Sequence, residues 1–435
     1  MIQETCSPGW TYIPETQQCR SPEQLTDDTL LDDAPNVAYD SAGNVVALWS
    51  RLKNPLADAA NTDPHTLRGD MEIVYAVRNA TTGVWSPPTP LTDNAVMDFL
   101  PQLQADANGN VMAVWLRDNG NDAPIFPDDP TPLGAELMFA QWDGAAWSAP
   151  AIAVSGAATN EAPQFALGDG GGLLVWSHDG DGDVTTDEDR EVRAATWNGT
   201  AWSAPSVLAG TADGLADVQP RVVYDSLNRA NVTWVKAEVP LSAEENDSAD
   251  QLFFTQVQGG AFSAPTLALQ SDALSEPRLI LEGGGRPLVV WQNYSQTGPD
   301  IFYSVRDAGS GLWSPPAQFT DSPELEWWFN PFVNDDGQLE VLFLEREVDT
   351  EPAPDGGSGG DGGGGEAEAG DPILVPTLTL SRLATAARTL GYDLAITQLA
   401  LATPQPSPGS VVQVTATVRN TGDYATPAST VVLRD

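Results

Sequence analysis

A short apolar strand that ends in an aromatic residue recurs six times along the chain, as in NVVALW and RPLVVW. The closing aromatics are Trp49, Trp115, Trp176, Trp234, Trp291 and Phe343. Six positions before each of them lies a residue that tolerates positive φ, glycine in five copies and Asn228 in the fourth, which predicts a tight turn between two strands. The spacings of 66, 61, 58, 57 and 52 residues are too irregular for a solenoid and suit a repeated sheet with loops of variable length.

A second column of residues extends each repeat. After a further strand and a turn rich in Asn, Asp or Gly, an aromatic residue is followed by Ser and Pro, with Ala between them in three copies. These aromatics are Trp85, Trp147, Trp202, Phe262 and Trp313. The pattern predicts four antiparallel strands per repeat, which is typical of a β-propeller blade. Because aromatics at one register of every blade usually pack between blades, we interpret them as core, with sugar-stacking platforms as the alternative.

The two ends of the repeat region predict how a ring would close. Residues 21–27 match the fourth strands although they precede the first repeat, so we expect them to complete the sixth blade. The third strand of that blade is expected at residues 373–383, or alternatively at residues 10–12. The predicted fold is all-β: a six-bladed β-propeller with N-terminal strand closure, plus a partial immunoglobulin-like β-sandwich. The segments are an N-terminal hairpin (1–20), the propeller (21–349), a Gly/Asp/Glu-rich flexible loop or linker (350–371), the last propeller strand and connection (372–390) and a C-terminal module (391–435).

The C-terminal module alternates apolar and polar residues with a period of two around a Pro-Ser-Pro-Gly turn. Asp393-Leu394, the Pro408-Gly409 turn and Val418-Arg419-Asn420-Thr421-Gly422 resemble the opening strands of a CARDB domain. The resemblance covers about 45 residues and implies the first half of an immunoglobulin-like module of bacterial surface proteins.

The charge balance excludes some classes of partner. With 61 acidic and 19 basic side chains, the net charge is 19 − 61 = −42, and neither nucleic acid nor an anionic membrane surface binds such a chain well. The sequence has no run of 18 apolar residues, so no membrane insertion is expected. Its first residues have neither the basic patch nor the apolar stretch of a signal peptide.

The two cysteines bear on the cellular compartment. Cys6 and Cys19 flank a Pro-Glu-Thr turn, and two strand arms around it would bring the sulfurs within bonding range, so we expect a local disulfide, with two free thiols as the alternative. A disulfide indicates an oxidising compartment, and hence a secreted or cell-surface protein of which this chain is a fragment lacking its signal peptide.

Loop lengths predict which end of the strands binds a ligand. The turns between first and second strands and between third and fourth strands are short, whereas most connections between second and third strands are long. The long connections are residues 50–69, 116–134, 177–190, 235–250 and 344–371. Because strands alternate in direction, these loops emerge on one face, where variable loops on a rigid scaffold usually bind.

One of the long loops has the composition of a calcium site. Its carboxylates are Asp179, Asp181, Asp183, Asp187 and Asp189. Acidic residues at alternate positions with Gly between them let a tight loop offer several oxygens to Ca²⁺. The spacing resembles the start of an EF-hand loop, but Val184 and Arg190 stand where that loop has Gly and Glu, so it is no EF-hand. We expect this loop to bind a structural Ca²⁺, with a merely solvated acidic loop as the alternative. Residues 118–122 (DNGND) have a similar but shorter pattern and are a weaker candidate.

Two residues beyond each second-strand aromatic lies a polar side chain. These are Arg51, Arg117, His178, Lys236, Asn293 and Glu345. Equivalent positions in six blades would form a ring, and four of the six can be cationic, so a carboxylate or sulfate of a glycan is one candidate ligand. The alternative is that each side chain pairs with an acidic residue of its own blade. Tyr294 adjoins this set.

The choice between an enzyme and a binding module rests on weak motifs. Residues 304–313 are similar to the Asp-box of sialidase-like propellers, although the spacing differs by two. That resemblance implies an arginine triad, a Tyr nucleophile with a Glu partner and an Asp acid/base. Arg51, Arg117 and Tyr294 match residue types only, and no catalytic residue can be assigned. We therefore predict an extracellular or cell-surface binding or adhesion module for a glycan or surface protein. The alternative is a sialidase-like glycoside hydrolase or polysaccharide lyase, and a structural spacer is a third possibility.

Overall fold

The computed structural model describes residues 11–13, 18–20, 25–55, 70–118, 135–155, 160–180, 189–237, 250–258, 260–271, 274–295, 298–320, 325–334, 337–346, 382–389, 394–401 and 414–420. The chain divides into two compact units, Met1–Leu208 (unit 1) and Ala209–Asp435 (unit 2), and each is described by itself. No helix that is long and apolar enough to cross a membrane occurs among these residues.

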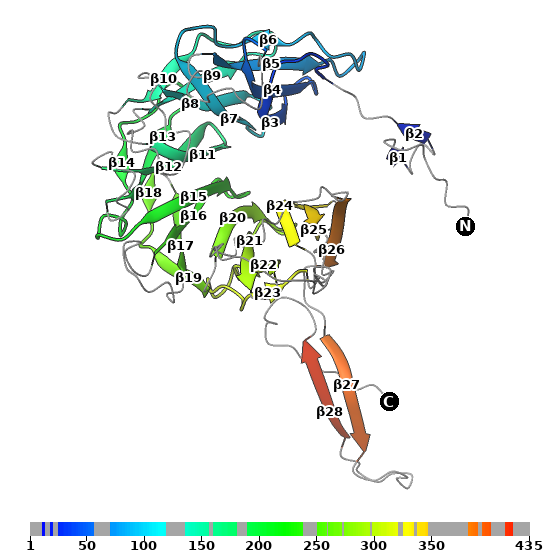
Figure 1. Ribbon diagram of the computed structural model, residues 1–435. Coiled ribbons are helices and arrows are strands. Elements are labelled where there is room, and N and C mark those ends of the chain that lie inside the picture. Colours follow the sequence, from blue (N-terminus) through cyan, green and yellow to red (C-terminus); the bar gives the residue numbers. More distant parts are fainter. Residues whose placement is uncertain are drawn as a thin grey trace, which may run out of the picture. The chain divides into compact units, whose positions relative to one another are not determined.

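Unit 1 contains three four-stranded sheets, here called blades 1 to 3, each an antiparallel meander in chain order (Figure 1). Blade 1 consists of β3 (Asp32–Tyr39), β4 (Val45–Leu52), β5 (Met71–Arg78) and β6 (Thr89–Pro90). Blade 2 consists of β7 (Met97–Ala105), β8 (Val111–Asp118), β9 (Ala135–Trp142) and β10 (Ala151–Val154). Blade 3 consists of β11 (Asn160–Gly168), β12 (Gly171–His178), β13 (Glu191–Trp197) and β14 (Ser206–Val207). A separate hairpin pairs β1 (Thr11–Ile13) with β2 (Gln18–Arg20).

Unit 2 continues the same architecture. Blade 4 consists of β15 (Asp217–Tyr224), β16 (Ala230–Lys236), β17 (Asp250–Gln258), β18 (Ala261–Phe262) and β19 (Thr266–Ser271). Blade 5 consists of β20 (Leu274–Leu281), β21 (Pro287–Ser295), β22 (Gly298–Val305) and β23 (Ala317–Gln318). Blade 6 consists of β24 (Leu325–Val333), β25 (Gln338–Arg346) and β26 (Arg382–Thr389). A last hairpin pairs β27 (Leu394–Leu401) with β28 (Val414–Asn420).

The all-β prediction is confirmed, together with the meander of each blade. The third strand of blade 6 is β26, which starts nine residues later than the predicted 373–383 and pairs over eight positions with β25, while residues 11–13 pair with β2 instead. Most of residues 21–27 lie outside the described part, so ring closure and blade number stay predictions. The same holds for the Cys6–Cys19 disulfide and for the CARDB-like module, of which the described part is the β27–β28 hairpin.

The second-strand aromatics form the core, as predicted, whereas those of the fourth strands are half-buried. Trp115, Trp176 and Trp234 are completely buried. The serine that follows each fourth-strand aromatic also has a local role, because its hydroxyl accepts a hydrogen bond from a third-strand N–H. In blade 2 the Ser148 Oγ accepts from the Gln141 N–H at 3.0 Å. The Trp-Ser pattern therefore fixes where the fourth strand leaves the third.

Carboxylates build the turns between first and second strands. In blade 2 the Asp106 Oδ1 accepts hydrogen bonds from the N–H groups of Asn108 and Asn110 at 2.8 and 2.9 Å, and its Oδ2 accepts from the Asn110 side-chain amide at 2.7 Å. Asp40 in blade 1 and Asp225 in blade 4 make the same pattern of contacts. Each turn is thus a five-residue loop with a fixed shape, and blade 3 is an exception that matters below.

Candidate functional site

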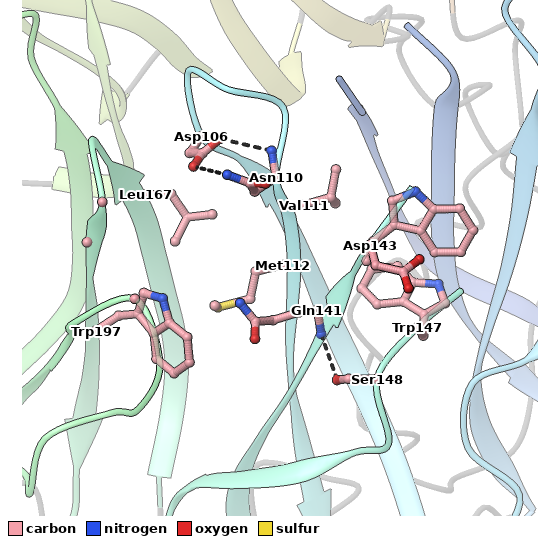
Figure 2. A pocket seen from close by; sticks show the side chains of 14 residues that line it. Asp106, Asn110, Val111, Met112, Gln141, Asp143, Trp147, Ser148, Leu167 and Trp197 are labelled. Carbon is pink, nitrogen blue, oxygen red and sulfur yellow. Dashed lines mark hydrogen bonds between the residues drawn. The ribbon is translucent and has the colours of Figure 1, made fainter. Parts of the chain in front are cut away.

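Unit 1 has a cavity of about 510 Å³ between blades 2 and 3, at the ends of the strands that carry the short turns. We call it the blade 2–3 cavity. Blade 2 contributes Asp106, Asn110, Val111, Met112, Gln141, Trp142, Asp143, Trp147 and Ser148. Blade 3 contributes Leu167, Gly170, Gly171, Trp197 and Gly199. Figure 2 shows Trp197 on one side, Asp143 and Trp147 on the other, and Met112 and Gln141 between them.

The contact between blades 1 and 2 shows how two neighbouring turns close against each other. The Ser41 N–H of blade 1 donates to the Gly109 carbonyl of blade 2 at 3.1 Å. A Cβ on Gly109 would lie 2.4 Å from the Ser41 nitrogen, so only glycine fits at this approach. The indole N–H of Trp142 in blade 2 also donates to the Asp40 carboxylate of blade 1 at 3.2 Å. The two five-residue turns of blades 1 and 2 are therefore in direct contact here.

Blade 3 lacks the five-residue turn, and this leaves the cavity open. In blade 2 the paired residues Ala105 and Val111 enclose five turn residues, whereas in blade 3 the paired Gly168 and Gly171 enclose only two. The shorter turn does not extend as far toward blade 2. A Cβ on Gly170 would have no atom within 4 Å, in contrast to the crowded Gly109. The deletion of three turn residues thus creates the space.

Tryptophan rings and planar polar groups share the walls of this cavity. The rings of Trp142 and Trp147 lie 5.6 Å apart at 56°, and Trp197 packs edge-to-face on Phe139 at 5.4 Å. These contacts fix the orientation of each indole. Gln141 is exposed on the cavity floor, and Asn110 is held by Asp106. The cavity therefore combines rigid apolar surfaces with amide donors and acceptors.

The predicted ring of charged residues is neutralised inside the blades. Arg51 pairs with Asp28 and, at 3.1 Å, with Asp32. Arg117 pairs with Asp98 at 2.8 Å. Lys236 pairs with Asp213 at 2.6 Å and with Asp217 at 3.4 Å. The structure therefore favours the alternative interpretation, in which each cation holds its own blade together.

The other members of the ring, together with the adjoining Tyr294, have local partners or have side chains outside the described residues. The His178 Nδ1 hydrogen-bonds to the Asn160 Oδ1 at 2.9 Å, and burial, followed by the positive charge of Arg193, lowers the pKa of His178 to about 4. Asn293 is half-buried and faces Asp300 in the register of β21 and β22. The side chains of Tyr294 and Glu345 lie outside the described residues. Ligand binding by these residues therefore stays a prediction.

Sequence analysis missed the acidic partners of these cations. The carboxylate of Asp98 is completely buried and accepts hydrogen bonds from the Trp115 indole N–H at 2.7 Å and from Arg117. Asp32 and Asp217 accept from Trp49 and Trp234 in the same way. A sequence signal was present, because each of these aspartates precedes its tryptophan by 17 positions.

The two ends of the predicted calcium loop lie close together. Asp179 is buried, and a Cβ on Gly180 would lie 2.9 Å from a carboxylate oxygen of Asp189. Asp181, Asp183 and Asp187 lie outside the described residues, as does most of the 118–122 segment apart from Asp118. Calcium binding therefore stays a prediction, and so does ligand binding by the long loops, most of which the structure does not describe.

A second cavity in unit 1, of about 280 Å³, lies at the opposite end of the blade 1 strands. Its lining includes Arg51, Lys53, Glu72 and Thr92. Glu72 is buried, and this burial raises the pKa of its carboxyl group, although Lys53 donates to it at 3.0 Å. We call this space the blade 1 cavity.

No family model matches the chain, and no curated protein matches it. Similar solved structures include an α-L-arabinanase from Penicillium chrysogenum complexed with arabinobiose, with 12% identity, a TM-score of 0.42 and coverage of 72% of this chain and 88% of that one. A polysaccharide lyase shows 10% identity, a TM-score of 0.46 and coverage of 78% and 81%. The NanB sialidase from Streptococcus pneumoniae shows 8% identity, a TM-score of 0.42 and coverage of 77% and 69%. With TM-scores below 0.5, these similarities carry no argument about ligand or activity.

Proposed function

We propose that the chain is a carbohydrate-binding protein whose unit 1 holds a sugar residue in the blade 2–3 cavity. The observation that carries this proposal is the cavity itself, in which Trp142, Trp147 and Trp197 stand beside Gln141 and Asn110. A sugar ring has an apolar face of C–H groups and an edge of hydroxyls. Fixed indole surfaces complement the first, and planar amides with several donors and acceptors complement the second.

The acidic residues of this cavity favour binding over hydrolysis there. Asp106 is engaged by three hydrogen bonds that hold its own turn. The N–H groups of Ala146 and Ala145 lower the pKa of Asp143. A glycosidase needs one carboxylic acid whose pKa is raised so that it can protonate the leaving group. Asp143 has the opposite bias, which supports recognition of a sugar over its hydrolysis at this cavity.

The wider setting belongs to the same proposal. A secreted or cell-surface location follows from the Cys6–Cys19 pair and the CARDB-like segment, and a structural Ca²⁺ follows from the acidic loop at 179–189. An adhesion role would use the sugar site on this rigid scaffold. The binding site that we propose lies at the short turns, and the long-loop face remains the candidate surface for a protein partner.

Affinity measurements with matched variants test the proposal. A glycan array identifies oligosaccharides that are retained, and isothermal titration then gives the Kd. We expect Gln141→Ala to weaken binding by about tenfold, the usual effect of one lost hydrogen bond in a desolvated site. Trp197→Ala should abolish binding, because it removes one wall of the cavity.

Trp202→Ala is the matched control for loss of packing. Trp202 also packs on Phe139, with ring centroids 6.3 Å apart, but it does not line the cavity. Because Trp202 also packs on Trp197, with ring centroids 5.4 Å apart, Trp202→Ala should cost comparable stability and weaken binding far less than Trp197→Ala. Retention of no glycan, or equal loss of affinity in Trp202→Ala and Trp197→Ala, would contradict the proposal.

A second candidate function, glycoside hydrolysis or elimination, rests on Glu72 in the blade 1 cavity. Its raised pKa suits a general acid, and Lys53 stands beside it to hold an acidic sugar. Incubation with neutral and acidic polysaccharides, followed by assays for reducing ends and for unsaturated products, separates hydrolase from lyase. Activity that Glu72→Gln removes and Trp197→Ala retains would establish this function, whereas absence of product with all substrates would refute it.

A further inference from the structure

Three arginines line one small cavity in unit 2. It lies between blades 4 and 5, has a volume of about 170 Å³ and includes Arg229, Arg286 and Arg306 in its lining. We call it the blade 4–5 cavity. Its other lining residues are Asp225, Ser226, Leu227, Gln256, Gly284, Gly285, Pro287 and Ala308. A chain with only 19 basic side chains and a net charge of −42 thus places three cations at one cavity.

Two of the arginines are oriented by an acidic residue of their own turn. The Arg229 Nε donates to the Asp225 Oδ2 at 2.8 Å, and the Arg286 Nε donates to the Glu282 Oε1 at 2.8 Å. Both pairs span four positions of a first-to-second-strand turn, where blade 2 has Asp106 and Asn110. The turn therefore fixes the position of each guanidinium group.

Arg306 differs from the other two. Its guanidinium carbon lies 4.6 Å from the ring centroid of Phe254, and its buried Nε has no hydrogen-bond partner within the described residues. Burial, followed by the positive charge of Arg229, lowers the pKa of Arg306. The fold thus holds a cation in a half-buried position next to a second cation, an arrangement that an anion would relieve.

The blade 4–5 cavity is the positional counterpart of the blade 2–3 cavity. Gln256 occupies the same third-strand position as Gln141. The N–H of Gln256 donates to the Ser263 hydroxyl just as the N–H of Gln141 donates to the Ser148 hydroxyl. Arg229 occupies the turn position of Asn110. Arg306 is paired with Trp313 by an isolated antiparallel β-bridge. Trp197 is paired with Trp202 in the same way, so Arg306 corresponds to Trp197. Two guanidinium groups thus stand in the blade 4–5 cavity where the blade 2–3 cavity has an amide and an indole.

We infer that the blade 4–5 cavity binds an oxoanion, the carboxylate or sulfate group of a small acidic ligand. A guanidinium group offers parallel N–H donors that match two oxygens of either group, and three such groups around one cavity favour bidentate contacts. Gln256 adds an amide on the neighbouring strand. This site is separate from Arg51, Arg117 and Lys236, and it does not depend on sugar binding in unit 1.

Titration of the full chain with simple anions tests the inference. Sodium sulfate and sodium glucuronate are titrated by calorimetry, with sodium chloride at equal ionic strength as the reference. We expect saturable binding of at least one probe, and Arg306→Gln should weaken it by tenfold or more. Binding of sulfate alone indicates a sulfated ligand, and binding of glucuronate alone indicates a carboxylated one.

Arg78→Gln is the matched control. Arg78 lies in the equivalent segment of blade 1 and forms the same type of β-bridge, with Trp85. Its Nη2 atom lies 3.2 Å from where a Cβ on Gly83 would be. The Nη2 atom of Arg306 lies 3.0 Å from the corresponding position on Gly311. Arg78→Gln should leave anion affinity unchanged.

Circular dichroism checks that the variants fold, and Arg286→Gln carries the test with the same expected loss if Arg306→Gln does not fold. Absence of saturable binding by both probes would overturn the inference. Equal weakening by Arg78→Gln and Arg306→Gln would overturn it as well.

Discussion

Removal of the Asp98 carboxylate should destabilise unit 1 strongly. Asp98 is completely buried and accepts four hydrogen bonds: from the Trp115 indole at 2.7 Å, from Arg117 at 2.8 and 3.0 Å, and from the Asn94 side chain at 2.6 Å. Asp98→Ala leaves the Arg117 side chain, which is only 18% exposed, without this counter-charge. Breaking one partner of a buried ion pair costs roughly 3–5 kcal/mol, and we expect a loss in that range.

Urea unfolding followed by tryptophan fluorescence measures this loss as a shift of the transition midpoint. The double variant Asp98→Ala/Arg117→Met is the decisive comparison, because it also removes the unpaired positive charge of Arg117 and keeps an apolar side chain of similar length. It should recover about half of the lost stability or more, since an apolar replacement for a whole buried pair is often neutral. A loss below about 1 kcal/mol in Asp98→Ala, or additive losses in the double variant, would refute the reasoning.

Three further predictions concern stability. The pKa of buried His178 is lowered to about 4 from its ordinary 6.5, so the unfolded chain binds more protons than the folded chain between these pH values. Acidification from pH 7 to pH 4 should therefore lower the free energy of unfolding by up to about 3 kcal/mol. Thermal melts of His178→Gln should lack this pH dependence. Gly109→Ala should cost more than the roughly 1–3 kcal/mol of strain that a non-glycine residue pays in the left-handed region, since its Cβ would also meet the Ser41 backbone. Gly170→Ala, with φ of 72° and open space around the Cβ, should cost only that strain. Equal melting temperatures of the two variants would contradict this prediction. Addition of EDTA should lower the melting temperature of the protein but not that of Asp181→Ala, and indifference of both would exclude calcium.

The repeated sheets could be predicted because their signals are local. A second-strand tryptophan preceded by a positive-φ turn appears in the sequence as a fixed spacing, and Trp115 is buried where that spacing places it. The third strand of blade 6 was placed too early, since residues 373–383 (ILVPTLTLSRL) are richer in large apolar and β-branched residues than the observed β26 (RLATAART). The local pattern therefore favours the earlier segment, whereas it is β26 that pairs with β25.

The candidate site could not be predicted from loop lengths. Long loops indicated one end of the strands, whereas the described aromatic cavity lies at the other end, where a two-residue turn at Gly170 fails to meet the five-residue turn of blade 2. A missing contact has no sequence signature of its own. The ion pair of Arg117 could not be predicted for a related reason, because the sequence shows the charge of Arg117 but not that the buried Asp98 lies beside it.

One position in the blades shows how this fold can vary its ligands. The residue that bridges to the fourth-strand tryptophan is Trp142 in blade 2, Trp197 in blade 3 and Arg306 in blade 5. Trp142 donates to the Asp40 turn and closes the gap to blade 1, whereas Trp197 lines an open cavity because the turn beside it is short. Arg306 makes the corresponding cavity cationic. Since the strand register is the same in each blade, the backbone does not constrain which side chain stands there. The side chain at this position therefore decides whether the cavity beside it presents an indole or a guanidinium group.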